Sequence, residues 1–454
     1  MSECKSRILC SDESKNLPSL FDNYSAQYLK RESEFVSKGG SGMALKLKFQ
    51  KGDHKKNVLL KVETGENVEK ADNLYREGIV GYEINKYAMV YPLFIETLGL
   101  FKESQDGDYE VDINNKPVKF KKLNTTPSIA DACHDFGKEA ILLEYIHGVP
   151  FKNMYKQDSF SHDLIPVLFQ VYYTLWCLGE DYTHYDLHTG NVMLTRPDKK
   201  ACVAFEYVLP TGEVVKFMSK YIANLIDNGR CFVSKFKNSL TEDLTRDKNC
   251  NNNHCGNLGD KCGFRNYKNP KHEGLGFRKA NVSHDLRLLN YAVNRMKQKQ
   301  AWKGPDVLFH EGGFSTVEIK HSGLNEKEPR IHNVADAGAV LAKMLEGNLE
   351  YFANVPVLGT LKVDGKTPWR FHYTHGSKHK SSQKSSHKSS QKSSQKSSHK
   401  SSHKSSHKSS HKSSHKSSHK SHSSHKSHSS THKTHSGGDL KNRKLNTRRK
   451  TAKF

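Results

Sequence analysis

Hydrophobic and polar positions divide the chain into a strand-rich front and a helix-rich back. Two-residue alternation in EFVSKGGSGMALKLKF and NVLLKVET predicts strands, and further strands are expected in LGLFKE and KEAILLEYI. DNLYREGIVGYEINKYAMVY predicts a helix that ends before Pro92. Residues 161–178 predict a long, mostly buried helix that ends at Gly179. ACVAFEYVLPTGEVVKFM predicts a hairpin, and residues 283–297 and 332–346 predict two more helices.

This order of elements predicts an α+β protein with two lobes. We expect a flexible lead-in over residues 1–30, a strand-rich first lobe over 31–146 and a helix-rich second lobe over 147–374. Residues 375–454 form a low-complexity tail that repeats SSHK or SSQK. The tail has almost no apolar side chains to offset the entropy of ordering, so we predict no secondary structure there.

The net charge of +24 belongs mainly to this tail, because 21 of the 72 Lys and Arg residues lie in residues 371–454, where Asp439 is the single acidic residue. The rest of the chain is close to balanced. The tail is a candidate for binding nucleic acid, anionic lipid or other polyanions. The alternative is a non-specific, disordered polycation. The closing LKNRKLNTRRKTAKF is a candidate nuclear-import or nucleic-acid patch.

The nine cysteines are irregularly spaced, the first residues lack the apolar core of a signal peptide, and no run of 18 apolar residues occurs. These features predict an intracellular, soluble protein with reduced thiols and no transmembrane segment. Cys250, His254, Cys255 and Cys262 form the only metal-like cluster. Their spacing matches no common zinc pattern, and the surrounding residues favour a flexible loop.

The stretch THYDLHTGNVML, residues 183–194, carries the densest candidate chemistry. Asp186 and Asn191 are five residues apart, and a loop that returns on itself can aim both side chains at one point. A carboxylate there can orient or deprotonate a hydroxyl, and an amide oxygen can bind Mg²⁺. The alternative is a polar turn without chemistry.

This stretch resembles the catalytic loop of the protein-kinase-like superfamily, and further pieces occur in the family's order. VSKGGSGMA at residues 36–44 is similar to its glycine-rich phosphate loop. Gly39 and Gly42 match the second and third glycines, whereas Ser37 replaces the first. The resemblance implies that the segment from Ser37 through Gly40, Ser41 and Gly42 contacts ATP phosphates. A flexible turn is the alternative.

Lys61 in VLLK resembles the lysine that contacts the α and β phosphates of ATP. The resemblance implies a glutamate partner on the next helix, for which Glu77 and Glu83 are candidates. Glu77 falls on the apolar face of the predicted helix, and a carboxylate buried there needs a cation, which favours Glu77. The distance to Pro92 favours Glu83 instead, so both remain open.

GKEAILLEYIHG resembles the strand and hinge that bind adenine, which implies contacts to the Glu144 carbonyl and the Ile146 amide. Asp227-Asn228-Gly229 resembles the metal-binding D-F-G segment and implies Asp227 as a second Mg²⁺ ligand. Asp285 in SHDLRLLNYAV is similar to the aspartate that braces the catalytic loop. The overall order looks most like the kinase-like proteins of large DNA viruses.

Two departures from the family leave the substrate open. His188 stands where serine/threonine kinases usually have lysine, and H-x-D-L-H-x-G-N is similar to the loop of aminoglycoside and choline kinases. No A-P-E segment follows Asp227, and residues 230–282 contain no recognisable peptide platform.

The resemblance implies an ATP- and Mg²⁺-dependent phosphotransferase, most simply a serine/threonine protein kinase. Asp186 and His188 would lie at the acceptor, and Asn191 and Asp227 would hold the metal. A small-molecule phosphotransferase is one alternative. The other is a pseudokinase scaffold with a polyanion-binding tail.

Overall fold

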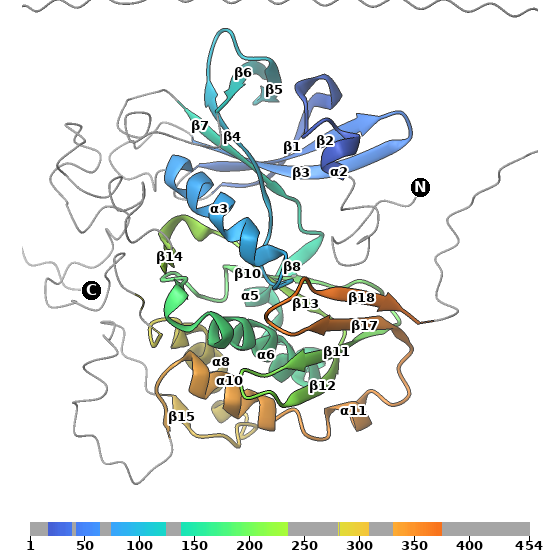
Figure 1. Ribbon diagram of the computed structural model, residues 1–454, viewed down its shortest axis with the longest axis vertical. Coiled ribbons are helices and arrows are strands. Elements are labelled where there is room, and N and C mark those ends of the chain that lie inside the picture. Colours follow the sequence, from blue (N-terminus) through green and yellow to red (C-terminus); the bar gives the residue numbers. More distant parts are fainter. Residues whose placement is uncertain are drawn as a thin grey trace, which may run out of the picture. The chain divides into compact units, whose positions relative to one another are not determined.

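The computed structural model describes residues 17–38, 42–63, 74–123, 138–234, 280, 282–307 and 330–374. These residues belong to one compact unit, Met1–Ser385, with mixed α+β structure (Figure 1). The repetitive tail and the cysteine and histidine cluster between residues 250 and 262 lie outside the described residues. Within them, no helix has the length and apolar content needed to cross a membrane.

A seven-stranded antiparallel sheet occupies the front of the chain, in the order β1-β2-β3-β7-β4-β6-β5. Its strands are β1 (Leu29–Lys38), β2 (Met43–Lys51), β3 (His54–Val62), β4 (Thr97–Glu103), β5 (Tyr109–Ile113), β6 (Lys116–Lys122) and β7 (Glu139–Glu144). Helix α3 (Leu74–Ala88) packs on β4 and β7 (Figure 1).

The alternation in β2 explains how this sheet builds its core. Leu45, Leu47 and Phe49 are buried, because successive side chains of a strand point to opposite faces. Gly52 lies between β2 and β3 with φ +58°, a conformation that glycine adopts without steric penalty. The predicted strands in this region are therefore present.

The segment just before β1 differs from the flexible lead-in expected for residues 1–30. Helix α2 (Leu17–Leu20) and the 3₁₀ turn η1 (Ala26–Tyr28) flank Phe21 and Tyr24, whose side chains are buried. Tyr24 packs edge-on against Phe49, and Tyr109 donates a hydrogen bond to the Tyr24 carbonyl. Two aromatic side chains therefore anchor a segment whose sequence is mostly polar.

The second part of the unit is built around helices. Its helical elements are α5 (Phe151–Met154), η2 (Asp158–Phe160), α6 (Ser161–Leu178), η3 (Gly179–Asp181), η4 (Asn228–Arg230), α8 (Leu286–Gln298), α10 (Val334–Lys343) and α11 (Asn348–Tyr351). Small sheets complete it: β8 (Gly148–Pro150) with β10 (Val192–Thr195) and β13 (Ile222–Leu225); β9 (Tyr182–Thr183) with β14 (Phe232–Val233); and β15 (Asp306–Val307) with β16 (Arg330–Ile331). The last sheet contains β11 (Cys202–Val208), β12 (Val214–Ser219), β17 (Val357–Val363) and β18 (Arg370–Tyr373).

Helix α6 lies among the other helices and strands of this second part of the unit (Figure 1), and its buried side chains belong to one hydrophobic cluster with residues from those elements. It is buried along most of its length, which fits a helix with apolar residues on nearly all sides. It ends at Gly179, whose amide donates to the Leu175 carbonyl and whose positive φ turns the following chain out of the helix. The predicted end of the helix and the predicted 201–218 hairpin are both confirmed.

Candidate functional site

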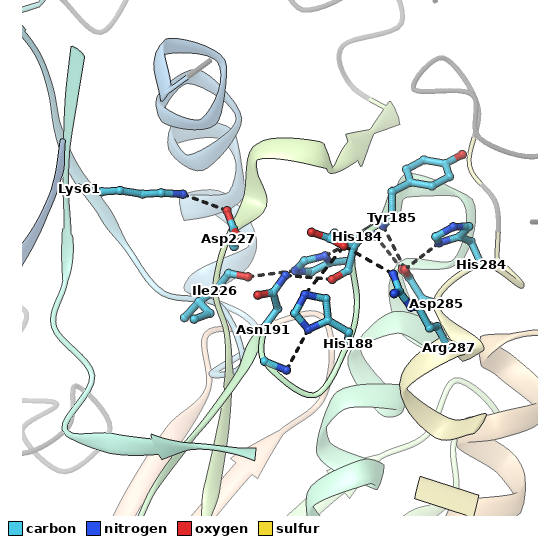
Figure 2. A network of polar contacts seen from close by, with 12 residues as sticks. Lys61, His184, Tyr185, His188, Asn191, Ile226, Asp227, His284, Asp285 and Arg287 are labelled. Atoms are coloured by element: carbon cyan, nitrogen blue, oxygen red, sulfur yellow. Dashed lines mark hydrogen bonds and ion pairs between the residues drawn. The ribbon is translucent and has the colours of Figure 1, made fainter. Parts of the chain in front are cut away.

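A half-buried lysine and two carboxylates form the first part of the candidate site. Lys61 comes from β3, Glu77 from α3, and Asp227 follows β13. The Lys61 Nζ lies 2.6 Å from Glu77 Oε2. It also lies 3.0 Å from Asp227 Oδ1 (Figure 2). The Glu77 side chain is only 5 % exposed, whereas that of Asp227 is 43 % exposed. The lysine is therefore fixed from the inside by Glu77, and Asp227 faces solvent.

The charges in this group explain its protonation. Burial by itself would lower the pKa of Lys61, but the nearby carboxylates of Glu77 and Asp227 outweigh burial and raise that pKa above its ordinary value. Lys61 is therefore a permanent cation at neutral pH. Two carboxylates face this one cation, so a further cation from solvent at the exposed Asp227 would complement the group.

The structure resolves the choice between Glu77 and Glu83. Glu77 lies on the buried face of α3 and reaches Lys61, whereas Glu83 pairs with Lys86 one helical turn away on the same helix. The burial argument made from the apolar face of the helix is therefore correct, and the estimate based on the distance to Pro92 is wrong for this chain.

Two further glutamates hold the beginning of α3, and sequence reasoning did not find them. Glu139 Oε2 accepts a hydrogen bond from the Tyr75 amide at 2.8 Å, and Glu63 Oε1 accepts one from the Leu74 amide at 3.3 Å. Carboxylates at this position satisfy amides that have no partner within the helix. Burial, followed by the charge of Glu63, raises the pKa of Glu139 to about 8. This arrangement fixes the helical turn that carries Glu77.

The loop from His184 to Asn191 is braced by Asp285. The Asp285 carboxylate accepts hydrogen bonds from the His184 amide at 2.7 Å and from the Tyr185 amide at 3.0 Å (Figure 2). Tyr185 has φ +58°, which is costly for a residue with a side chain and persists only where the surroundings enforce it. The brace enforces this conformation directly before Asp186. Asp285 therefore has the structural role expected for it.

Hydrogen bonds inside the loop fix Asn191 and connect it to the segment before Asp227. Asn191 Nδ2 donates to the Asp186 carbonyl at 2.9 Å. His184 Nδ1 accepts from the Asp186 amide, so the hydrogen lies on its Nε2, which bonds the Ile226 carbonyl at 3.1 Å. The Ile226 amide donates to the Asn191 carbonyl. The five-residue spacing therefore produces a folded loop joined to the residue preceding Asp227.

Asp186 has two basic neighbours, and neither makes a close contact. His188 Nε2 lies 3.9 Å and Arg287 Nη1 lies 3.7 Å from Asp186 Oδ1. The other ring nitrogen of His188, Nδ1, accepts a hydrogen bond from the Gly190 amide at 2.9 Å. Burial, and to a lesser degree the charge of Arg287, lowers the pKa of His188, although Asp186 opposes this shift. His188 is therefore mainly neutral at pH 7.

Asn191 and Asp227 are the residues suited to hold a metal ion. The Asn191 amide nitrogen is used within the loop, which leaves its oxygen as the metal-binding atom, and Asp227 offers a partly exposed carboxylate. Oxygen donors suit Mg²⁺, which commonly takes one or two protein ligands and completes its shell with water and phosphate. In the parts of the chain that the structure describes, no three His, Cys, Asp or Glu side chains form a metal cluster.

The glycine-rich segment is only partly described. Gly39, Gly40 and Ser41 lie outside the described residues, and Ser37 is exposed at the end of β1. Gly42 has φ +156°, and a Cβ atom there would come within 2.0 Å of the Val62 carbonyl oxygen. This position therefore requires glycine, because the backbone passes directly beside the residue that follows Lys61.

The proposed hinge residues lie at the end of β7. Glu144 is the last residue of this strand, and Ile146 is half-buried two residues further on. The Glu144 amide donates to the Glu96 carbonyl at 2.9 Å, and the Ile146 carbonyl accepts from the Gly148 amide at 3.0 Å. The connection has a defined conformation, and contacts of Glu144 and Ile146 with adenine remain a prediction.

Sequence reasoning also missed Arg287 at this site. The available signal was its position two residues after Asp285: if Asp285 braces the loop, a long side chain on the next turn can reach Asp186.

No family model and no curated protein sequence matches this chain.

Proposed function

We propose that the chain is an ATP- and Mg²⁺-dependent phosphotransferase with a two-lobed, protein-kinase-like fold, and that it transfers phosphate to a serine or threonine hydroxyl of a protein. In this proposal the seven-stranded sheet and α3 form the nucleotide-binding lobe, and the elements around α6 form the catalytic lobe.

One observation supports the proposal most strongly: two groups of polar side chains, held by different segments of the chain, lie next to each other. Lys61, held by Glu77, contacts Asp227, and the residue before Asp227 is hydrogen-bonded to the loop that carries Asp186 and Asn191. Each pairing joins segments far apart in the sequence. A polar turn without chemistry would not need a cation–carboxylate group at the same place, so this convergence favours catalysis over the alternative of a simple turn.

The residues present suit ATP and Mg²⁺. Lys61 supplies a fixed positive charge for phosphate oxygens, and Gly42 permits backbone to pass close to the strand that carries Lys61. Asn191 and Asp227 would supply two oxygen ligands to the metal, with phosphates and water as the remaining ligands. Bound ATP would supply the phosphoryl group, and bound Mg²⁺ would neutralise charge on it.

Asp186 is assigned to the acceptor hydroxyl. Its backbone is held on both sides, by the strained Tyr185 before it and by the Asn191 side chain on its carbonyl. A carboxylate fixed in this way can accept the hydroxyl proton and align the oxygen with the phosphorus. His188 is mainly neutral and its Nδ1 accepts from the Gly190 amide, so its Nε2–H is available to donate a hydrogen bond to a reacting group without adding a full charge.

A second candidate, a small-molecule phosphotransferase, is favoured by His188 itself, because this residue stands where protein kinases usually have lysine. The fold and the roles of Lys61, Asp186, Asn191 and Asp227 would be the same, and only the acceptor would differ.

The test is incubation of the full-length chain with γ-labelled ATP, with Mg²⁺ or with EDTA, and with separate panels of proteins and small alcohols. We expect Mg²⁺-dependent label on protein serine or threonine. Label on a small alcohol alone would favour the second candidate. Nucleotide binding without transfer to any acceptor or to water would contradict both candidates and favour a scaffold.

A further inference from the structure

Arg287 carries a positive charge beside Asp186 that the proposed chemistry has not used. It lies in the first turn of α8, its side chain is 28 % exposed, and its Nη1 is 3.7 Å from Asp186 Oδ1. Its guanidinium makes no hydrogen bond to another residue in the described ranges. A guanidinium has five donors arranged to grip a carboxylate or phosphate, so this group is suited to a further anion.

The positive charge of Arg287 does not stabilise α8. Cations in the first turn of a helix oppose the helix dipole. The Asp285 carboxylate at the start of α8 favours this helix end by its charge, but its two oxygens accept hydrogen bonds from the amides of His184 and Tyr185 and not from Arg287. The Asp186 side chain is 20 % exposed, and its Oδ1 lies 3.7 Å from Arg287 Nη1, which is an ion pair but too long for a hydrogen bond between these two atoms. The Arg287 guanidinium therefore pairs with Asp186 and lies 6.0 Å from the centroid of the Tyr291 ring, and its hydrogen-bond donors have no acceptor in the described ranges.

Lys152 is a second cation beside this loop. Its backbone amide donates to the Thr189 carbonyl at 2.8 Å, and its Cδ lies 4.0 Å from the position of a Cβ atom at Gly190. The Lys152 side chain is exposed and forms no ion pair with a carboxylate of the described residues. Since His188 is mainly neutral, Lys152 and Arg287 supply the positive charge around this part of the loop.

Arg287 lies away from the nucleotide side. Figure 2 shows Arg287 on the opposite side of the His184–Asn191 loop from Lys61 and Asp227. In phosphoryl transfer the acceptor oxygen and the leaving oxygen lie on opposite sides of the phosphorus. If Lys61 and Asp227 hold the nucleotide phosphates, as proposed above, Arg287 faces the acceptor.

We propose that Arg287 and Lys152 bind an acidic side chain of the acceptor, so that the preferred substrate is a serine or threonine within an acidic peptide segment. This inference rests on the proposed function. It has a direct corollary within this chain: the SSHK repeats place lysine beside each serine pair, so the tail is a poor acceptor for its own catalytic site.

The experiment compares two peptides of equal length with the full-length protein: one with a single serine flanked by Asp and Glu, and one with the SSHKSSHK sequence. Phosphoryl transfer and peptide binding by fluorescence anisotropy are measured for the wild type, Arg287→Gln, Arg287→Lys, Lys152→Gln and Arg295→Gln. Arg295 is a matched control, because it lies on α8 about 12 Å along the helix from Arg287 and bonds Gln298.

We expect the wild type to prefer the acidic peptide at least about tenfold in kcat/KM, mainly through KM, and to lose this preference in high salt. Arg287→Gln should bring the ratio of kcat/KM for the acidic peptide to kcat/KM for the SSHKSSHK peptide toward one. Lys152→Gln should lower this ratio less, and Arg287→Lys should retain most of it. Arg295→Gln should match the wild type.

Equal use of both peptides by an active wild type, or an unchanged ratio in Arg287→Gln, would overturn the inference and leave the proposed function standing. If the wild type neither transfers phosphate nor hydrolyses ATP, the proposed function fails, and this inference fails with it. Equal binding of both peptides in the anisotropy measurement would overturn the acidic preference without reference to turnover.

Discussion

The two halves of the candidate site differ in how completely their charges are matched. Around Lys61, one cation contacts two carboxylates at 2.6 and 3.0 Å, and the inner partner, Glu77, is buried. Around Asp186, the basic groups of His188 and Arg287 lie at 3.7 to 3.9 Å and are partly exposed. The charges around Lys61 are paired before any ligand binds, whereas the basic groups around Asp186 have hydrogen-bond donors available for a ligand. This difference suits a fixed nucleotide site beside an acceptor site that is completed by its substrate.

Asp227→Asn should have the largest effect on the Lys61 half, because it removes the charge of the carboxylate that we propose as a metal ligand. We expect Mg²⁺-dependent nucleotide binding to weaken by roughly 100-fold. Mutation of residues that only hydrogen-bond to a metal ligand already lowers metal affinity by about 10–100-fold. Titration of nucleotide with and without Mg²⁺ checks this. An unchanged Mg²⁺ dependence would remove Asp227 from the metal site.

Lys61 and Glu77 should act as a coupled pair. In a double-mutant cycle with Lys61→Met and Glu77→Gln, we expect a coupling free energy of about 1–3 kcal/mol in nucleotide binding, because the side chains are in direct contact. Glu83→Gln is the matched control on the same helix and should be additive with Lys61→Met. Coupling to Glu83 instead of Glu77 would contradict the buried pair seen at the first half of the site.

Glu139→Gln should change the pH dependence of stability. Because the pKa of Glu139 is raised from 4.5 to about 8, its protonated form stabilises the fold, and this contribution is lost as pH rises from about 4.5 to 8. Glutamine preserves the acceptor for the Tyr75 amide. The free energy of unfolding of the variant should therefore exceed that of the wild type by about 1 kcal/mol or more at pH 8.5, and the two should converge near pH 5.

Denaturant unfolding at the two pH values measures this difference, with the half-exposed Glu103→Gln as the control. A variant that is less stable than the wild type at pH 8.5 would show that the Glu139 carboxylate holds α3 in its charged form.

The smallest expected effect concerns His188. Arg287 contributes to lowering the pKa of His188, after burial, so Arg287→Gln should raise it while burial continues to hold it down. The ring proton shifts in an NMR titration report this pKa, and Arg295→Gln should leave it unchanged. A lowered or unaltered His188 pKa in Arg287→Gln would mean that the two side chains do not share one electrostatic environment.

Local pattern predicted the elements better than it predicted their partners. The end of α6 follows from a local signal, the glycine at position 179, which adopts a positive φ. The hairpin of β11 and β12 likewise follows from a polar turn between two alternating strands. The burial of Phe21 and Tyr24 depends on Phe49 and Tyr109, which a local reading of residues 1–30 does not include.

The same limit applies to the site. Glu77 could be favoured over Glu83 because the periodicity of one helix distinguishes its faces. The Arg287 contact with Asp186 joins residues about one hundred positions apart, and the Glu139 contact with Tyr75 joins residues 64 positions apart. Such pairings follow from tertiary packing, and no local periodicity contains them.

The most direct test of the central claim is the transfer of labelled γ-phosphate and the binding of nucleotide, measured on one preparation each of the wild type and Asp186→Asn. In the proposed function Asp186 faces the acceptor while Lys61 and Asp227 hold the nucleotide, so we expect transfer to fall by about 10²–10⁴-fold with nucleotide affinity nearly unchanged. Transfer by Asp186→Asn at the wild-type rate, or its loss together with nucleotide binding, would contradict the division of this site into a nucleotide half and an acceptor half.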